Sequence, residues 1–282
     1  MTDTDIRYGD WTPQNEVITE RIDATQARKL AATLDRTEDG IEDGAPLPAM
    51  WHWVYFLPRA PMAAIGTDGH PERGGFFPPV ELQRRMFAGA RTTFHKPLLI
   101  GEEATRTGAI TALAEKEGRA GRMVLATAQY TIAQGGETCI TDTHDIIYIA
   151  GGGETPQPGP DAWSPPDDGW HKAVHVDGVM LFRYSALIFN GHRIHFDREY
   201  TRDEEGYPGL VVTGPLTATL LAGFADEHTD REMTAFSFRG RAPLFDFTPF
   251  HLTGHLDGDT AALEAQRNDG VTAMTATAEY AA

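Results

Sequence analysis

Most of the side chains that could transfer protons lie in one segment, residues 184–221. Asn190, His192 and His195 fall within six residues of one another, and Asp197 follows two positions later. Histidine has the side-chain pKa nearest neutrality, so it can act as a base and then as an acid in one turnover. An asparagine amide can hold a water molecule or a carbonyl group without adding charge. This spacing predicts proton-transfer chemistry.

The segment continues into a predicted helix start. Gly206, Pro208 and Gly209 interrupt regular structure, and Gly214-Pro215 is typical of a helix N-terminus with proline in the first turn. Free backbone N–H groups at such an end can stabilise a negative oxygen. A proton shuttle facing these groups suits addition or elimination beside a thioester carbonyl, where an enolate-like charge must be held.

We therefore assign roles from the residues themselves. His195 is the candidate general base that activates water, Asn190 positions this water, and the N–H of Gly214 polarises the carbonyl group. His192 and Asp197 support them, and a catalytic part for His192 stays open.

Two alternatives apply to the histidines. They could be structural, or His192, His195 and Asp197 could bind a metal ion through two imidazoles and a carboxylate. A zinc site usually needs a further ligand and residues that hydrogen-bond to the ligands. The sequence shows no such residue at a fixed spacing from the motif. We expect no metal.

The motif resembles a known family. FNGHRIHFD (189–197) followed by EGYPGLVVTGPL (205–216) resembles the hydration motif of MaoC-like, R-specific enoyl-CoA hydratases. It is more similar to their two-domain relatives, the mesaconyl-CoA and itaconyl-CoA hydratases and the mitochondrial hydroxyacyl-thioester dehydratases. LPAMWHWVYFLP (47–58) and RGGFFPPVELQRRMFAGARTTFHKPLLIG (73–101) look like the N-terminal half of that subgroup. The resemblance covers roughly residues 11–250.

The resemblance implies an α+β double hot-dog fold, in which two helices are each wrapped by an antiparallel sheet around a thioester tunnel. It implies a hydratase or dehydratase of an enoyl-CoA, such as a branched C5 dicarboxylic one, with CoA as part of the substrate and no cofactor. Asn190 matches the catalytic aspartate of the wider group, and His195 matches its catalytic histidine. Thr213 stands where the subgroup usually has histidine, and Phe196 where tyrosine is common.

Two other functions compete with this interpretation. A hot-dog thioesterase would use a carboxylate to attack or activate water at the thioester carbon, and Asn190 in the key position argues against it. A non-catalytic acyl-binding subunit, or a dehydratase altered for a biosynthetic substrate, stays open because of Thr213.

Candidate substrate-binding residues occur in both halves. In the C-terminal half they are Arg193 and Arg198, for CoA phosphates or a substrate carboxylate, and the loop residues Tyr207, Pro208 and Gly209. In the N-terminal half the aromatic run is either core or tunnel lining, and the arginines are either surface charges or an anion clamp. The candidates there are Trp51, Trp53, Arg73 and Arg85, with Arg84 and Arg91 in the same arginine-rich stretch.

Composition sets broad limits. The 282 residues are 41% hydrophobic and 23% charged, as in ordinary globular proteins. The net charge of −17 argues against nucleic acid or anionic membrane as a partner. Cys139 is the only cysteine, which excludes an intrachain disulfide. Without a membrane-length apolar run or a signal peptide pattern, we expect a cytoplasmic protein, and a homodimer is left open.

The order of predicted elements indicates two equivalent halves. Residues 1–150 would form an N-terminal hot-dog domain that contributes to the tunnel without catalytic residues, and 171–282 a C-terminal domain with the motif; the Gly/Pro-rich stretch 151–170 would link them. His95 and His144 are interpreted as structural, and the Gly/Pro-rich loop 59–79 as a lid or rim. The remaining elements are a helix over 24–35 capped by Asp23, four strands within 90–149, a helix over 214–228, and strands over 233–244, 246–258 and 271–282.

Overall fold

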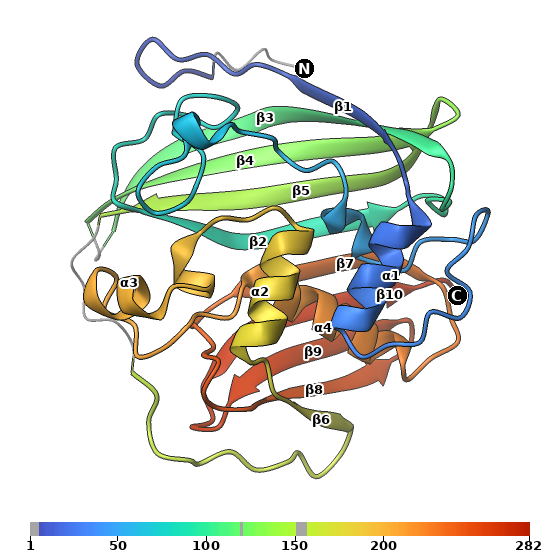
Figure 1. Cartoon of the computed structure of the whole chain (residues 1–282). Coiled ribbons are helices and arrows are strands. Elements are labelled where there is room, and N and C mark those ends of the chain that lie inside the picture. The colour runs from blue at the N-terminus through green and yellow to red at the C-terminus, as the bar shows by residue number, and fades with distance from the viewer. Residues whose placement is uncertain (1–5, 119–120, 151–156) are drawn as a thin grey trace.

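One antiparallel sheet organises the molecule (Figure 1). The computed structural model describes residues 6–118, 121–150 and 157–282. Within them, ten strands pair in the order β1-β3-β4-β5-β2-β7-β10-β9-β8-β6. The strands are β1 Glu16–Arg21, β2 Arg84–Phe94, β3 Glu103–Gly118, β4 Gly121–Gln134, β5 Glu137–Ile149, β6 Trp170–Val174, β7 Met233–Gly240, β8 Phe250–Asp257, β9 Thr260–Arg267 and β10 Thr272–Tyr280.

The strand order contains the same pattern twice. The first half reads β1-β3-β4-β5-β2, and the second reads β6-β8-β9-β10-β7. Antiparallel pairing of β2 with β7 joins the halves into one sheet. This duplication is the topology expected of a double hot-dog chain.

Four helices pack on this sheet or beside the motif: α1 Ala24–Thr33, α2 Gly178–Leu187, α3 Arg198–Asp203 and α4 Gly214–Asp226. The Asp23 carboxylate accepts a hydrogen bond from Thr25 N and caps α1, as predicted. α4 is apolar on nearly all sides because it is buried against β7, β8, β9 and β10. α1 packs mainly against α2 and the 3-10 turn η1 Trp51–Val54, so the two halves are not equal in their helices.

Of the four strands predicted within 90–149, three correspond to β3, β4 and β5, and the first overlaps only the end of β2. The strand predicted over 233–244 ends at Gly240, and the one over 246–258 begins at Phe250. β2 begins at Arg84, earlier than predicted, because its pairing with β5 continues to that residue. Elements that were not predicted are β1, β6, β9, α2 and α3.

The main hydrophobic core contains residues of both halves. Its buried residues include Leu30 of α1, Ile132 of β4 and Leu221 of α4. The linker packs on the second half through Trp163, whose ring stacks on His251 at 3.5 Å. Residues 151–156 of the predicted linker lie outside the described residues. Because sheet and core are continuous, the division into separate domains stays a prediction.

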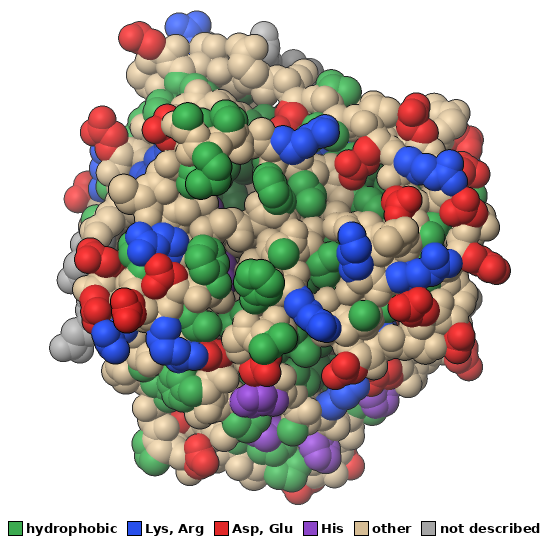
Figure 2. Space-filling model, viewed as in Figure 1, with side chains coloured by type: hydrophobic (Ala, Val, Ile, Leu, Met, Phe, Trp, Pro, Cys, Tyr) green, Lys and Arg blue, Asp and Glu red, His purple; other side chains and the backbone are tan. Residues whose placement is uncertain are grey.

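In the described part of the chain, the helices are too short or too polar to cross a membrane. Figure 2 shows charges of both signs mixed over one face, with a central hollow rimmed largely by hydrophobic side chains.

Candidate active site

The motif begins where α2 ends. Phe189 adopts a left-handed conformation (φ 50°), and Asn190 N donates to Ser185 O at 2.8 Å, which closes the helix. The chain then forms a 3-10 turn, η3 Arg193–His195, and enters α3. Asp197 caps α3 by accepting from Tyr200 N at 3.0 Å. Asp197 thus caps α3 and pairs with Arg193, and its predicted supporting role at the site stays a prediction.

A loop from the N-terminal half packs against the motif. Gly69 and Gly191 approach so closely that a Cβ on Gly69 would lie 1.8 Å from the Gly191 carbonyl oxygen. Arg193 N donates to Asp68 O at 2.9 Å across the same contact. A Cβ on Gly191 would in turn lie 2.7 Å from the Gly69 carbonyl oxygen, so the contact between the two loops requires glycine at both positions. The loop 59–79, predicted as a lid or rim, meets the motif directly.

His195 has a defined tautomer. Its side chain is 7% exposed, and its Nδ1 lies 2.7 Å from Val211 O. A carbonyl oxygen only accepts hydrogen bonds, so Nδ1 carries the proton and Nε2 keeps its lone pair. Burial lowers the pKa of His195 to about 4, although the Val211 bond opposes the shift. At neutral pH, His195 is a neutral base with Nε2 ready to take a proton.

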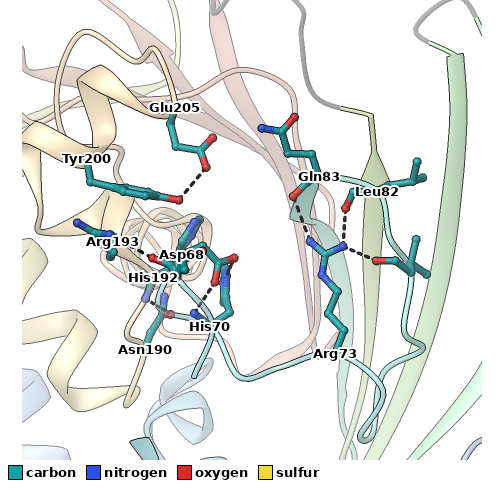
Figure 3. Close-up of polar contacts among 12 residues, drawn as sticks. Asp68, His70, Arg73, Leu82, Gln83, Asn190, His192, Arg193, Tyr200 and Glu205 are labelled. Carbon is teal, nitrogen blue, oxygen red and sulfur yellow. Dashed lines mark hydrogen bonds and ion pairs between the residues drawn. The ribbon is translucent and has the colours of Figure 1, made fainter. Parts of the chain in front are cut away.

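Two further groups adjoin this base. The His192 ring lies edge-on to His195 at 5.2 Å between centroids and stacks on His70 at 4.0 Å. His70 Nδ1 pairs with Asp68 Oδ2 at 2.9 Å (Figure 3). Burial lowers the pKa of His192 to about 2, and the neighbouring histidines disfavour its charge further. Burial also lowers the pKa of His70, against the opposing effect of Asp68.

Asp68 and His70 were not predicted as site residues. The D-x-H spacing is visible in TDGHPERGG, but it lies more than 100 positions before the motif. Only tertiary contact brings the two segments together. Burial raises the pKa of Asp68, yet hydrogen bonds from His70 outweigh this effect and hold the pKa well below its usual range. The site therefore contains an ionised carboxylate. The rings of His70 and His192 lie between it and His195.

The residues that could bind a metal ion differ from those expected from the sequence. Asp197 pairs with Arg193 at 2.8 Å, so the set His192, His195 and Asp197 is not assembled. Ligand atoms of Asp68, His70 and His192 instead lie within 4.8 Å of one another. However, the two imidazoles are stacked with a 33° tilt, whereas zinc requires lone pairs that converge tetrahedrally. The expectation of no metal stays a prediction.

Asn190 is oriented by its own loop. Its Oδ1 accepts from His192 N at 3.1 Å. The amide nitrogen donates to no acceptor in the described residues, so it is the atom that can reach a ligand. Asn190 can therefore donate to a water oxygen and leave the water's hydrogens free for a base.

The start of α4 supplies the predicted N–H group. Thr213 occupies the N-cap, 2% exposed, and its side chain makes no capping hydrogen bond. Gly214 N lies in the first turn, whose amides lack acceptors within the helix, and it donates to none elsewhere in the described chain. Pro215, the next residue, lines a cavity of about 250 Å³. A carbonyl group at the mouth of this cavity would meet the helix N-terminus.

Two cavities border the site, and His195 lines neither of them. The smaller has mainly apolar walls, including Trp53 and Phe87 from the N-terminal half. The larger, about 860 Å³, is polar and is lined by the Asp68–His70 loop, Arg85, Arg193 and part of α3.

Three of the predicted arginines line the larger cavity. Arg193 already binds Asp197 and Thr67 O, and its guanidinium lies 4.1 Å from the Tyr200 ring centroid. Arg73 donates to three carbonyl groups of residues 80–83 and points toward them in Figure 3. Arg85 forms no ion pair with any described residue. It is the arginine best placed to bind an anion, and its role stays a prediction.

Of the other predicted binding residues, only Trp53 lines one of the two cavities. Trp51 is 3% exposed and belongs to the core, while Trp53 lines the smaller cavity. Arg198 pairs with the buried Asp246 and so fixes the chain beside the motif. Tyr207, Pro208 and Gly209 line neither cavity, and a Cβ on Gly209 would meet the Phe247 ring at 2.5 Å. For Trp51, Arg198 and the loop 207–209 the structure shows packing or ion pairing, and their role in substrate binding stays a prediction.

Comparison with known proteins gives the family. The sequence model of hydroxyacyl-thioester dehydratase type 2 matches residues 50–246. The chain is 48% identical over 269 residues to a mesaconyl-C4-CoA hydratase of Chloroflexus aurantiacus, covering 95% of this chain and 96% of that one. It is 26% identical over 238 residues to the mitochondrial hydroxyacyl-thioester dehydratase type 2 of Schizosaccharomyces pombe, covering 73% and 78%.

Solved structures confirm the fold. A MaoC-like dehydratase superimposes with a TM-score of 0.71 at 16% identity, covering 96% of this chain and 98% of that one. A conserved Mycobacterium tuberculosis protein described as having a double hotdog fold gives 0.58 at 13% identity, covering 96% and 97%. The α+β double hot-dog prediction is therefore confirmed. The chain belongs to the hydroxyacyl-thioester dehydratase type 2 family of MaoC-like double hot-dog proteins, and it is a hydro-lyase that adds or removes water at an enoyl thioester.

Proposed function

We propose that this hydro-lyase hydrates a short enoyl-CoA that carries a second carboxylate, of the mesaconyl-C4-CoA type. The neutral His195, with its Nε2 lone pair fixed by the Val211 carbonyl, is the observation that carries the reaction type. The 48% identity to a mesaconyl-C4-CoA hydratase supports the substrate class.

The proposed reaction uses three groups. Gly214 N–H and the α4 dipole polarise the thioester carbonyl, which makes the β-carbon electrophilic. The Asn190 amide donates to the oxygen of a water molecule, and His195 Nε2 takes one of its protons as the oxygen bonds to the β-carbon. The negative charge that develops on the thioester oxygen is held by the N–H group. His195 then returns its proton to the α-carbon, and dehydration is the reverse.

His192, His70 and Asp68 position this base. Because His192 packs edge-on against His195 and is kept neutral by burial, it adds no positive charge beside the base. The hydrogen-bonded Asp68 holds His70, whose ring supports His192. Arg85, in the adjoining polar cavity, is proposed to bind CoA phosphates. We also propose a cytoplasmic location, and a homodimer stays open.

The test is mass spectrometry of the protein incubated with a panel of enoyl-CoA thioesters. We expect a gain of one water, and a loss of roughly 10²–10⁴-fold in rate in His195→Ala. His95→Ala, at an exposed histidine bonded to Thr141, is the matched control and should keep full activity. A chelator should leave the rate unchanged because no step needs a metal.

Other outcomes would identify the alternatives. Release of free CoA would show a thioesterase. Thioesters that remain unchanged with the wild-type protein would indicate an acyl-binding role or a different substrate.

A further inference from the structure

A buried carboxylate outside the motif collects four hydrogen bonds. Asp142, in β5, is 2% exposed. Its Oδ2 lies 2.7 Å from Trp53 Nε1, 2.6 Å from His144 Nε2 and 3.1 Å from His52 Nε2. Thr92 Oγ1 donates to its Oδ1 at 2.8 Å. None of these five residues takes part in the proposed proton transfers.

The network fixes the His144 ring. Burial would raise the pKa of Asp142, but the charge and hydrogen bond of His144, together with His52, hold this pKa well below its usual range. An ionised carboxylate only accepts hydrogen bonds, so Nε2 of His144 must donate. The other ring nitrogen of His144, Nδ1, bonds to no described residue. The hydrogen bond from Nε2 to Asp142 thus fixes the orientation of the His144 ring.

His52 and His144 both line the smaller cavity. The His52 Nδ1 is fully buried without a partner. The His144 ring is framed by Phe87 and Tyr130, each at 4.9 Å, and by Trp53 at 5.9 Å, and it lines the cavity. This placement allows a ligand contact for His144 in addition to the structural role predicted from the sequence.

The cavity has one polar region within apolar walls. Beside His144 it is lined by Arg106, which pairs with Glu16 and lies 4.7 Å from the Tyr130 ring centroid. Pro215 at the start of α4 and Ile188 at the end of α2 also line it, so the cavity adjoins the proposed carbonyl site. Its volume of about 250 Å³ has room for a short acyl group.

We propose that His144, positioned by Asp142, binds the free carboxylate of a short dicarboxylic acyl group inside this cavity. The inference rests on the proposed function, because it places the thioester carbonyl at Gly214. The carboxylate accepts a hydrogen bond from His144 Nδ1, which requires the imidazolium form of the ring, with Nε2–H donated to the ionised Asp142. Arg106 lines the same cavity. An acyl group that ends in a methyl offers no acceptor to Nδ1, so the cavity selects for a carboxylate.

Kinetics with two substrates tests this assignment. The substrates are mesaconyl-C4-CoA and crotonyl-CoA, which lacks the second carboxylate. For His144→Gln we expect kcat/KM with mesaconyl-C4-CoA to fall roughly 10–100-fold, the value of one hydrogen bond to a charged group. Crotonyl-CoA should change less than about threefold, because only the carboxylate contact is lost. His95→Gln is the matched control and should change neither.

Binding of unreactive analogues gives a second readout that needs no turnover. In calorimetry, the wild-type protein should bind succinyl-CoA more tightly than butyryl-CoA, and His144→Gln should lose this preference while its thermal unfolding stays cooperative. Equal losses for both acyl groups, or a preserved preference, would refute the role of His144 alone. If the wild type hydrates neither substrate, the proposed function fails and this inference with it.

Discussion

At the scale of single residues, one hydrogen bond determines how the site can work. The Val211 carbonyl fixes the proton of His195 on Nδ1, and burial disfavours the imidazolium. A histidine in water would be partly protonated near pH 6.5 and would lose its function as a base there. His195 stays neutral well below that pH.

The pH dependence of kcat/KM follows from this. The base is active only when unprotonated, so we expect kcat/KM to be flat from about pH 5 to 8 and to fall about tenfold per unit below about pH 4, the pKa of His195. Circular dichroism at each pH should accompany the kinetics. Between about pH 4 and 6.5 the unfolded chain binds a proton that folded His195 does not, so stability itself decreases as the pH falls through this window. An acid limb near pH 6.5 in a fully folded protein would contradict the assignment.

At the scale of elements, the segment before α4 positions the base. Val211 N donates to Ile194 O at 3.0 Å, and Leu210 N donates to Asp246 Oδ1 at 3.0 Å. Asp246 also pairs with Arg198, which ties α3 to this segment. The backbone hydrogen bonds of Val211 and of its neighbour Leu210 therefore fix the position of the Val211 carbonyl, which orients His195.

Asp246→Ala should disturb this arrangement. It leaves the buried Leu210 N–H without a partner and frees Arg198, so we expect a loss of about 1–3 kcal/mol in the free energy of unfolding. We also expect a larger effect on kcat than on KM, since orientation of the base is affected before binding. Glu115→Ala is the control, because its ion pair with Arg122 is 51–52% exposed, lies at neither cavity and should contribute little to stability. A kcat equal to that of the control would argue against this role.

At the scale of the whole molecule, the β2–β7 pairing unites the halves. Site residues come from both sides of it: Asp68, His70 and His144 from the first half, and His192 and His195 from the second. The shared core should make unfolding a single cooperative transition.

Gly89→Ala tests the pairing of β2 with β7. A Cβ at Gly89 would lie 2.4 Å from Phe238 O on β7, so the strands must separate locally. We expect a loss of about 1–3 kcal/mol, seen as a lower Tm, together with reduced activity. Gly75→Ala, where a Cβ meets nothing within 4 Å, should leave the Tm nearly unchanged. Two separate transitions in the wild-type protein would show that the halves unfold independently.

The sequence by itself determined the local features of this protein. The cap at Asp23, the proline-started helix α4 and the alternating strands β3, β4 and β5 follow from short-range patterns, and so do the family motif and its histidines. These features depend on residues near each other in the chain, so they can be predicted without tertiary contacts.

Tertiary structure decided what depends on distant contacts. β9, TAALEAQR, has the composition of a helix, yet pairing with β8 and β10 makes it a strand. Contact between Gly69 and Gly191 brings Asp68 and His70 to the motif, and the fold turns His144 toward the cavity beside α4. Contacts between segments far apart in the chain place these groups, and no local sequence pattern records them.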